Sequence, residues 1–149
     1  MSLKESWAQE IFQRLVDGQR QEVMYNVLDD AEWIFVNPYI KSTILSDTYH
    51  GPTEYWTKAE PIYRQIFRAP MKFTLRRLSV VGNLAFGELK GETVGKKDNE
   101  KYIMPQVSVC LVLEFNPTNE EEDGGKPRCK GVTEYLDSAL LQKFMDNNL

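Results

Sequence analysis

The second half of the sequence reads as a series of strands joined by polar turns, and this feature constrains the fold most. Its runs are rich in β-branched and aromatic residues and are interrupted by Gly, Asn and Asp. Strands are expected at residues 73–81, 84–93, 102–115 and 131–136. Because most of these strands follow one another closely along the chain, they are expected to pair antiparallel.

The first half of the chain predicts helices around a single strand. Helices are expected at residues 3–17, at 23–28 and from 52 towards Pro70, with a strand at 31–36 and an ordered loop, with room for a short strand, at 39–51. Pro61 lacks a backbone N–H inside the third helix, which predicts a kink or a break there. A short final helix is expected after Asp137, which can cap it together with Ser138.

Helices that come first and strands that come later are typical of an α+β protein rather than of alternating βαβ units. A chain of 149 residues, 42% of them hydrophobic, is long enough to bury one core. The sequence therefore predicts a single α+β domain over residues 1–149.

Charge and hydropathy exclude several classes of protein. The net charge of −4, from 18 basic and 22 acidic side chains, argues against nucleic-acid binding, because phosphate contacts need clustered Lys and Arg. No apolar run approaches the roughly 20 residues of a membrane span, and the polar start of the chain does not resemble a secretory signal. Cys110 and Cys129 lack CxxC spacing, so thiols in a reducing cytoplasm are expected rather than a disulfide. A cytoplasmic protein without nucleic-acid or membrane partners is predicted.

An acidic segment precedes the last strand. Residues 116–128 contain four consecutive acidic side chains followed by two glycines, which is typical of a mobile surface loop. A metal site is the alternative, but glycines leave the carboxylates without a fixed backbone, and His50 is the only histidine. No metal site and no cofactor are predicted.

Three segments resemble parts of a known family. They are residues 30–38 (DAEWIFVNP), 49–54 (YHGPTE) and 132–141 (VTEYLDSALL). Their order and spacing are similar to those of the SnoaL-like branch of the nuclear-transport-factor-2-like (NTF2-like) superfamily over nearly the whole chain. The resemblance implies a cone, in which a curved antiparallel sheet wraps around N-terminal helices and an internal pocket admits a small hydrophobic ligand. It also implies a homodimer through the outer face of the sheet.

Alternation along the strands predicts which side chains face the pocket. The residues assigned to the inner face are Ala85, Gly87, Leu89 and Gly91 in one strand and Val107, Val109 and Leu111 in the next. The small residues are expected to leave room for a ligand or to let the sheet bend. This assignment places the more polar Gln106 and Ser108 on the outer face.

Glu134 is the leading candidate for chemistry. It shares one face of the last strand with Val132 and Leu136, so it is expected to point inward. A carboxylate between apolar neighbours is expected to have a raised pKa and could serve as a general acid or base. Two other interpretations stay open: a buried hydrogen bond or ion pair that holds the helices to the sheet, and exposure to solvent.

Two further polar residues are candidates to assist Glu134. His50 is the candidate proton shuttle, because histidine is the side-chain type that ordinarily changes charge near neutral pH, or it could have only a surface or capping role. Asn37 precedes a proline at a position where the resemblance places the general-base aspartate of ketosteroid isomerase, and an amide cannot take that proton. Asn37 could still hydrogen-bond a ligand carbonyl, or it could be only a turn residue.

Aromatic and aliphatic side chains supply candidate walls for the pocket, although each could equally be ordinary core packing. The predicted ligand-binding residues are Trp33, Phe35, Tyr55, Trp56, Tyr63, Phe67, Leu89, Val107, Val109, Leu111 and Leu136.

The resemblance, with Glu134 as the acid or base, implies a cofactor-independent isomerase, cyclase or lyase acting on a small hydrophobic metabolite of polyketide or terpenoid type. A non-catalytic ligand-binding or protein-interaction module of the same fold is the alternative. A filled interior with Glu134 in an internal ion pair favours the module, whereas an open apolar pocket with Glu134 at its base favours the enzyme.

Overall fold

A computed structural model describes residues 5–18, 28–112 and 129–149, with the backbone alone for 28–31, 52 and 110–112. The expected acidic loop lies outside the described residues, and so does the expected helix at 23–28 apart from Leu28, which begins a strand. The helices described are α1 (Glu5–Val16), α3 (Pro52–Ile66) and α5 (Ser138–Asn148). The strands described are β1 (Leu28–Phe35), β2 (Asp47–His50), β3 (Lys72–Val81), β4 (Leu84–Val94), β5 (Lys101–Val112) and β6 (Cys129–Leu136).

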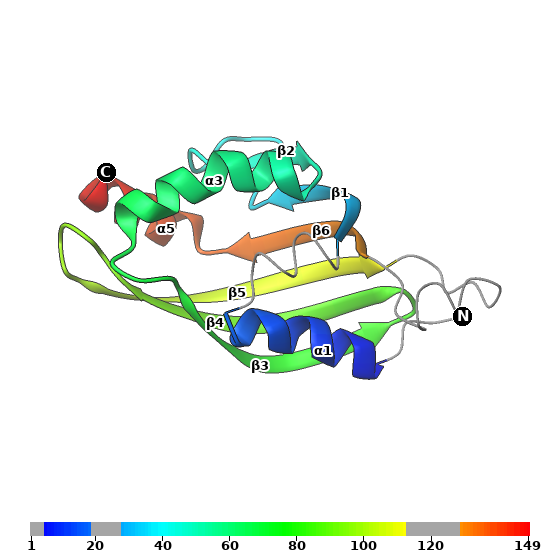
Figure 1. Cartoon of the computed structure of the whole chain (residues 1–149). Coiled ribbons are helices and arrows are strands. Elements are labelled where there is room, and N and C mark those ends of the chain that lie inside the picture. The colour runs from blue at the N-terminus through cyan, green and yellow to red at the C-terminus, as the bar shows by residue number, and fades with distance from the viewer. Residues whose placement is uncertain (1–4, 19–27, 113–128) are drawn as a thin grey trace.

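The strands form one curved, unclosed sheet in the order β2-β1-β6-β5-β4-β3 (Figure 1). Neighbouring strands are antiparallel except β1 and β6, which run parallel. Parallel neighbours need a long connection, and most of the chain lies between these two. The α+β fold is confirmed, with one parallel pair that the strand pattern did not predict.

Local chemistry accounts for where several elements begin and end. Gly82 turns the chain between β3 and β4 with a φ of 58°, a left-handed conformation that favours glycine. Asp137 caps α5 as expected, because its side chain accepts a hydrogen bond from Leu140 N at 3.0 Å. The break expected at Pro61 is absent, since α3 continues through it. The carbonyl left without its helical partner belongs to Thr57, which is exposed and can bond water instead.

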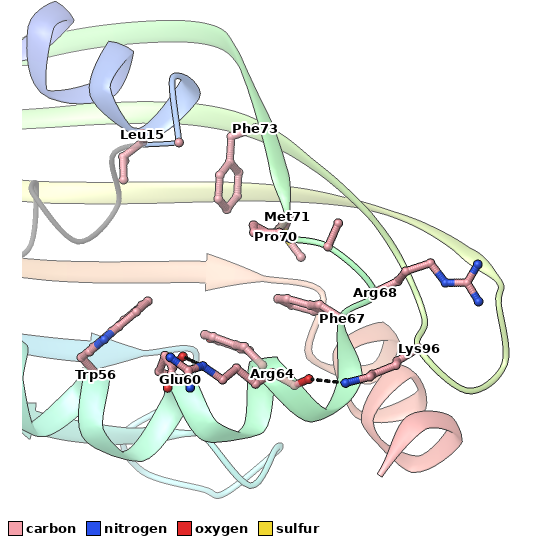
Figure 2. Close-up of a pocket in the computed structure, with 13 residues that line it drawn as sticks. Leu15, Trp56, Glu60, Arg64, Phe67, Arg68, Pro70, Met71, Phe73 and Lys96 are labelled. Atoms are coloured by element: carbon pink, nitrogen blue, oxygen red, sulfur yellow. Dashed lines mark hydrogen bonds and ion pairs between the residues drawn. The ribbon is translucent and has the colours of Figure 1, made fainter.

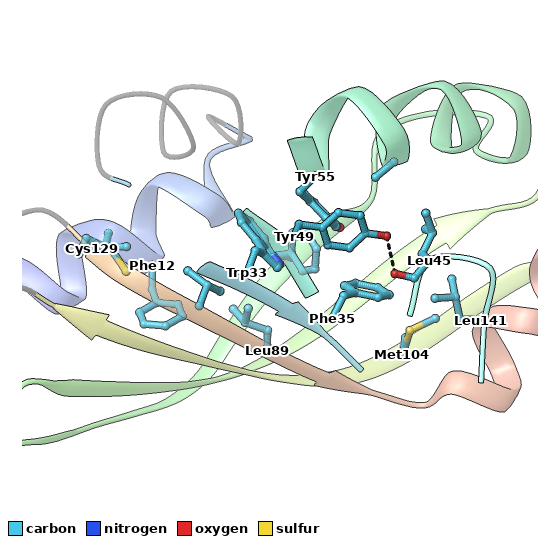
Figure 3. Packing of buried hydrophobic residues seen from close by; sticks show 14 of the residues in the cluster. Phe12, Trp33, Phe35, Leu45, Tyr49, Tyr55, Leu89, Met104, Cys129 and Leu141 are labelled. Carbon is cyan, nitrogen blue, oxygen red and sulfur yellow. Dashed lines mark hydrogen bonds between the residues drawn. The ribbon is translucent and has the colours of Figure 1, made fainter. Parts of the chain in front are cut away.

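One hydrophobic core joins the helices to the inner face of the sheet (Figure 3). Its largest fully buried members are Tyr55, Phe12, Phe144, Ile11, Leu45, Ile66, Leu89, Met104 and Met145. They come from α1, α3, α5, two strands and the loop before β2, so all the described layers share this core. No helix within the described ranges is long and apolar enough to cross a membrane.

The inner face of β4 carries small residues, as expected, but the helices use the space that they leave. A Cβ atom built at Gly87 would collide with the ring of Phe12 from α1, and one built at Gly91 would collide with Sδ of Met71. The expectation that these glycines leave room for a ligand is therefore wrong. Their role is to let α1 and the start of β3 approach the sheet closely.

The end of α5 is tied to the turn between β4 and β5. Asn148 is completely buried, and its Oδ1 accepts hydrogen bonds from Lys97 N at 2.8 Å and Asp98 N at 3.2 Å. Its Nδ2 donates to Phe144 O at 2.8 Å. These three bonds hold the turn at residues 95–98 in a defined position against the helix.

Replacing Gly87 with Ala should lower the free energy of unfolding by about 1–3 kcal/mol, because the added methyl group meets the Phe12 ring. Urea denaturation followed by circular dichroism measures this change. The matched control is Gly87→Ala in a Phe12→Leu background, where the smaller side chain should make the same substitution less destabilising. An equal loss in both backgrounds would show that Phe12 is not the obstacle.

Candidate functional site

A buried carboxylate lies on the inner face of the sheet. Glu134 of β6 is 6% exposed, so its predicted inward orientation is confirmed. Its Oε2 accepts a hydrogen bond from Trp33 Nε1 at 3.2 Å, and its Oε1 accepts one from Gln106 Nε2 at 3.3 Å. Both donors are neutral, so these bonds stabilise the carboxylate without neutralising its charge.

The strand order brings these donors together. Because β6 lies between β1 and β5, Trp33 approaches Glu134 from one side and Gln106 from the other. Ser108 stands directly opposite Glu134 in the β5–β6 ladder, and its Oγ accepts a hydrogen bond from Gln106 Nε2 at 3.1 Å. We call these four residues the Glu134 cluster.

The inner face of β5 carries the residues that were predicted to face outward. Gln106 and Ser108 are buried at 8% and 3% exposure, whereas Val107 is 36% exposed. The prediction that Val107 and Val109 point into a pocket is therefore wrong. The side chain of Leu111 lies outside the described residues.

The ladder between β4 and β5 explains this correction. Gln106 pairs with Leu89, which is buried on the inner face, and Val107 pairs with Glu88. Directly opposite residues share a face of the sheet, so Gln106 must follow Leu89 inward.

A cleft of about 510 Å³ opens between α3, the end of α1 and the start of β3 (Figure 2). This volume is within the usual range of small-molecule sites, about 300–1,000 Å³. The cleft is lined by Leu15, Gly18, Trp56, Glu60, Tyr63, Arg64, Phe67, Arg68, Ala69, Pro70, Met71, Phe73 and Lys96. Its walls are mostly aromatic and aliphatic, and its charged members come from α3 and the segments beside its C-terminal end.

A second, much smaller cavity of about 20 Å³ reaches Glu134 itself. A cavity needs roughly 10–15 Å³ to hold a water, so this one has room for about one. Four side chains line both cavities: Tyr63, Phe67, Met71 and Phe73. Glu134 therefore lies behind a shared wall of the cleft and does not line the cleft directly.

The eight predicted ligand-binding residues outside β5 divide into three groups. Trp56, Tyr63 and Phe67 line the cleft. Phe35 and Leu136 line the small cavity beside Glu134. Trp33, Tyr55 and Leu89 belong to the buried core and line neither cavity.

The tyrosines of the core connect Trp33 to the wall of the cleft. Tyr55 stacks on Trp33 with ring centroids 4.4 Å apart, and its hydroxyl lies 2.8 Å from that of Tyr63. Tyr49 packs edge-on against Tyr55 and donates a hydrogen bond to Leu45 O at 2.6 Å (Figure 3). Burial raises the pKa of Tyr49 to about 12, so this hydroxyl stays protonated and acts as a structural donor.

The end of β1 is strained next to Glu134. Val36 has a φ of 64°, an unfavourable value for a β-branched residue, and its backbone N donates to Glu134 O at 2.8 Å. The turn that follows is held by Asn37, whose Oδ1 accepts hydrogen bonds from Tyr39 N at 2.9 Å and Ile40 N at 3.2 Å. Asn37 thus has the turn role that its position before proline allowed.

His50 lies at the exposed end of β2, where its backbone N donates to Glu54 Oε2 at 3.2 Å. Neither His50 nor Asn37 lines the cleft or the small cavity, so the structure does not bring them together with Glu134 in one site. Within the described part of the chain, no three His, Cys, Asp or Glu side chains lie close enough together to hold a metal ion.

Sequence reasoning missed Gln106 and Ser108, and it also missed the cleft residues after α3. The signal for Gln106 and Ser108 was their spacing of two residues from Tyr102 and Met104, because alternate residues of an uninterrupted strand lie on the same face. No sequence signal identified Met71 and Phe73 as cleft residues, because their position depends on how β3 leaves the end of α3.

Comparison of the sequence with models of protein families and with curated proteins finds no match. Solved structures do match. An NTF2-like protein from Burkholderia thailandensis superposes with a TM-score of 0.69 at 14% identity, covering 94% of this chain and 95% of that one. A SnoaL-like protein from Jannaschia sp. CCS1, described as a candidate polyketide cyclase, gives 0.70 at 10% identity, covering 97% and 95%.

The structure of TerC, crystallised with polyporic acid, gives a TM-score of 0.70 at 11% identity and covers 94% of this chain and 98% of TerC. At these identities the likeness concerns the fold. The chain therefore has the NTF2-like fold, in the form shared with SnoaL-like proteins.

Proposed function

We propose that this protein is a cofactor-independent isomerase, cyclase or lyase that acts on a small hydrophobic metabolite, with Glu134 as its general acid or base. The observation that carries the proposal is the Glu134 cluster: a buried carboxyl side chain, hydrogen-bonded by Trp33 and Gln106, behind the aromatic wall of a ligand-sized cleft. Solved structures of the same fold include candidate polyketide cyclases and a protein crystallised with a small molecule, which supports a small-molecule ligand.

The chemistry that such a carboxylate can perform is a proton transfer. Ionised Glu134 would take a proton from a carbon next to a ligand carbonyl, and the resulting carboxylic acid would return a proton at another position of the ligand. No electrons are exchanged overall, so the reaction needs no redox cofactor. Trp33 and Gln106 would hold the carboxylate in one orientation through their hydrogen bonds to its two oxygens.

Access to Glu134 requires a change in the wall between the two cavities. Met71 lines both cavities and has an unbranched, adaptable side chain, so its rotation could join them. The water-sized cavity beside Glu134 would then become the inner end of the cleft, and the Tyr63 ring would remain part of its wall.

A non-catalytic ligand-binding module is the second candidate. The observation in its favour is the small volume beside Glu134, about 20 Å³, together with the hydrogen bonds that already occupy the cluster. In this alternative Glu134 ties three strands together and the cleft alone binds the ligand.

Exchange of an acidic C–H group distinguishes the two candidates. With 2-tetralone, a small apolar enolisable ketone, the wild-type protein should accelerate deuterium uptake from heavy water, as measured by mass spectrometry. Glu134→Gln should reduce this acceleration by about 100- to 10,000-fold, the usual contribution of a general acid or base. Glu92→Gln, which makes the same change at a half-exposed strand residue paired with lysines, should leave the rate unchanged.

Retention of the wild-type exchange rate in Glu134→Gln would overturn the acid/base role. Binding of 2-tetralone without any exchange by the wild-type protein would favour the ligand-binding module. Circular dichroism of both variants should match the wild type, since Gln is close to Glu in shape.

We propose that the protein forms a homodimer through the outer face of its sheet. Val107 and Tyr135 are directly paired across β5 and β6, and they are 36% and 54% exposed, with Ile103 nearby on β5 at 48%. The purified protein should run as a dimer at micromolar concentration in size-exclusion chromatography with light scattering. Tyr135→Arg should shift it towards monomer, whereas Tyr39→Arg, which changes a 92% exposed loop residue, should not. A monomeric wild-type protein would overturn the proposal.

A further inference from the structure

Basic side chains outnumber acidic ones among the described residues that line the cleft. Among the described residues, four charged side chains contribute to its lining, and three of them are basic: Arg64, Arg68 and Lys96. Glu60, the fourth, forms an ion pair with Arg64 one helical turn away. Arg68 and Lys96 have no ion pair with any carboxylate among the described residues. The rim of the cleft is therefore positive, although the chain as a whole carries a charge of −4.

Backbone hydrogen bonds hold the main chain at Arg68 close to the main chain at Lys96. Arg68 N donates to Val94 O at 3.0 Å, and Lys96 N donates to Ile66 O at 2.9 Å. Between them, Phe67 and Gly95 form an antiparallel bridge. The turn that carries Lys96 is also fixed by α5, through the hydrogen bonds of the buried Asn148 already described. The fold thus fixes the backbone positions of Arg68 and Lys96 at one end of the cleft.

Both side chains keep donors available for a ligand. Lys96 Nζ donates one hydrogen bond to Arg64 O at 3.3 Å, and an ammonium group has two further donors. In Figure 2 the Arg68 guanidinium extends away from the aromatic walls at the same end of the cleft as Lys96. The Arg68 side chain is exposed, so rotation about its own bonds can bring the guanidinium over the mouth.

We infer that the cleft selects ligands that are both apolar and anionic, with a carboxylate or an acidic phenol or enol held by Arg68 and Lys96 and a flat apolar body against Trp56, Phe67 and Phe73. The aromatic walls bind the apolar part of the ligand by burying its surface. An anionic group would be unfavourable against such walls alone, and Arg68 and Lys96 stabilise it through charge-assisted hydrogen bonds. The inference rests on the proposed function in taking the cleft as the ligand's binding site, and it adds the chemical class of the ligand.

Three probes with the same ring test this selectivity: 2-naphthylacetic acid, its primary amide and 2-(2-naphthyl)ethylamine. Ligand line broadening in NMR titrations gives each dissociation constant at equilibrium. The acid should bind about three- to tenfold more tightly than the amide, and the amine should bind most weakly. The preference for the acid should fall as salt is raised, because these cations are exposed. Equal binding of acid and amide would overturn the inference.

Substitutions distinguish the contribution of the charged rim to binding from that of the aromatic walls. Arg68→Gln with Lys96→Gln should abolish the preference for the acid while leaving binding of the amide unchanged. The control, Arg76→Gln with Lys101→Gln, removes the same net charge from side chains that pair with β4 carboxylates, and the preference should persist. Loss of the preference in the control as well would show a general effect of net charge and would overturn the proposed site. Trp56→Ala should weaken acid and amide alike, and a lack of any effect would place the ligand outside the cleft.

These measurements are independent of turnover. Line broadening of the acid, the amide and the amine reports binding alone and requires no proton transfer by Glu134. If the cleft prefers the acid but the protein catalyses no exchange, this inference stands and the proposed enzymatic function is wrong. If the protein catalyses exchange of 2-tetralone but does not prefer the acid, the proposed function stands and this inference is wrong.

Discussion

The burial of Glu134 is the constraint on which the centre of the sheet depends. A carboxylate removed from water costs several kcal/mol unless hydrogen-bond donors surround it. Here the described donors come from both neighbouring strands, so β6 must lie between β1 and β5 with Trp33 and Gln106 on the inner face. A slip of β5 by one residue would turn Val107 inward and take the Gln106 donor away from the carboxylate. The register of the central strands and the burial of Glu134 therefore support each other.

This constraint also shows what could be predicted from the sequence. The element order, the α+β class and the inward direction of Glu134 followed from alternation and from three recognisable segments. The orientation of β5 did not, because its alternate residues are Val107 and Val109 on one side and Gln106 and Ser108 on the other. Binary patterning assigns the apolar set to the interior, and that rule fails where an interior carboxylate needs polar neighbours. The inward Glu134 predicted from the same sequence was the clue that a neighbouring strand must supply donors.

The position of the cleft could not be predicted for a different reason. Small residues on β4 suggested an empty space above the sheet, but Phe12 and Met71 occupy it. The open volume lies instead between α3 and the start of β3, where Phe67 and Phe73 both line the cleft (Figure 2). Its existence depends on the angle at which the chain leaves α3, and local propensity does not encode that angle. Because of tertiary packing, the pocket lies at the boundary between α3 and β3 and not over the sheet surface, where it was predicted.

The two cavities differ in the charged residues that line them. Arg68 and Lys96 line the cleft but not the cavity beside Glu134, and Glu134 lines the small cavity but not the cleft. An anionic ligand would be repelled by a nearby carboxylate, so its charge is best placed at the rim and its apolar part against the wall in front of Glu134. Under the proposed function, the carbon to be deprotonated would belong to the apolar part in that orientation, and the Glu134 carboxylate would reach it once Met71 rotated. The separation of positive rim and buried carboxylate would then position the ligand as well as bind it.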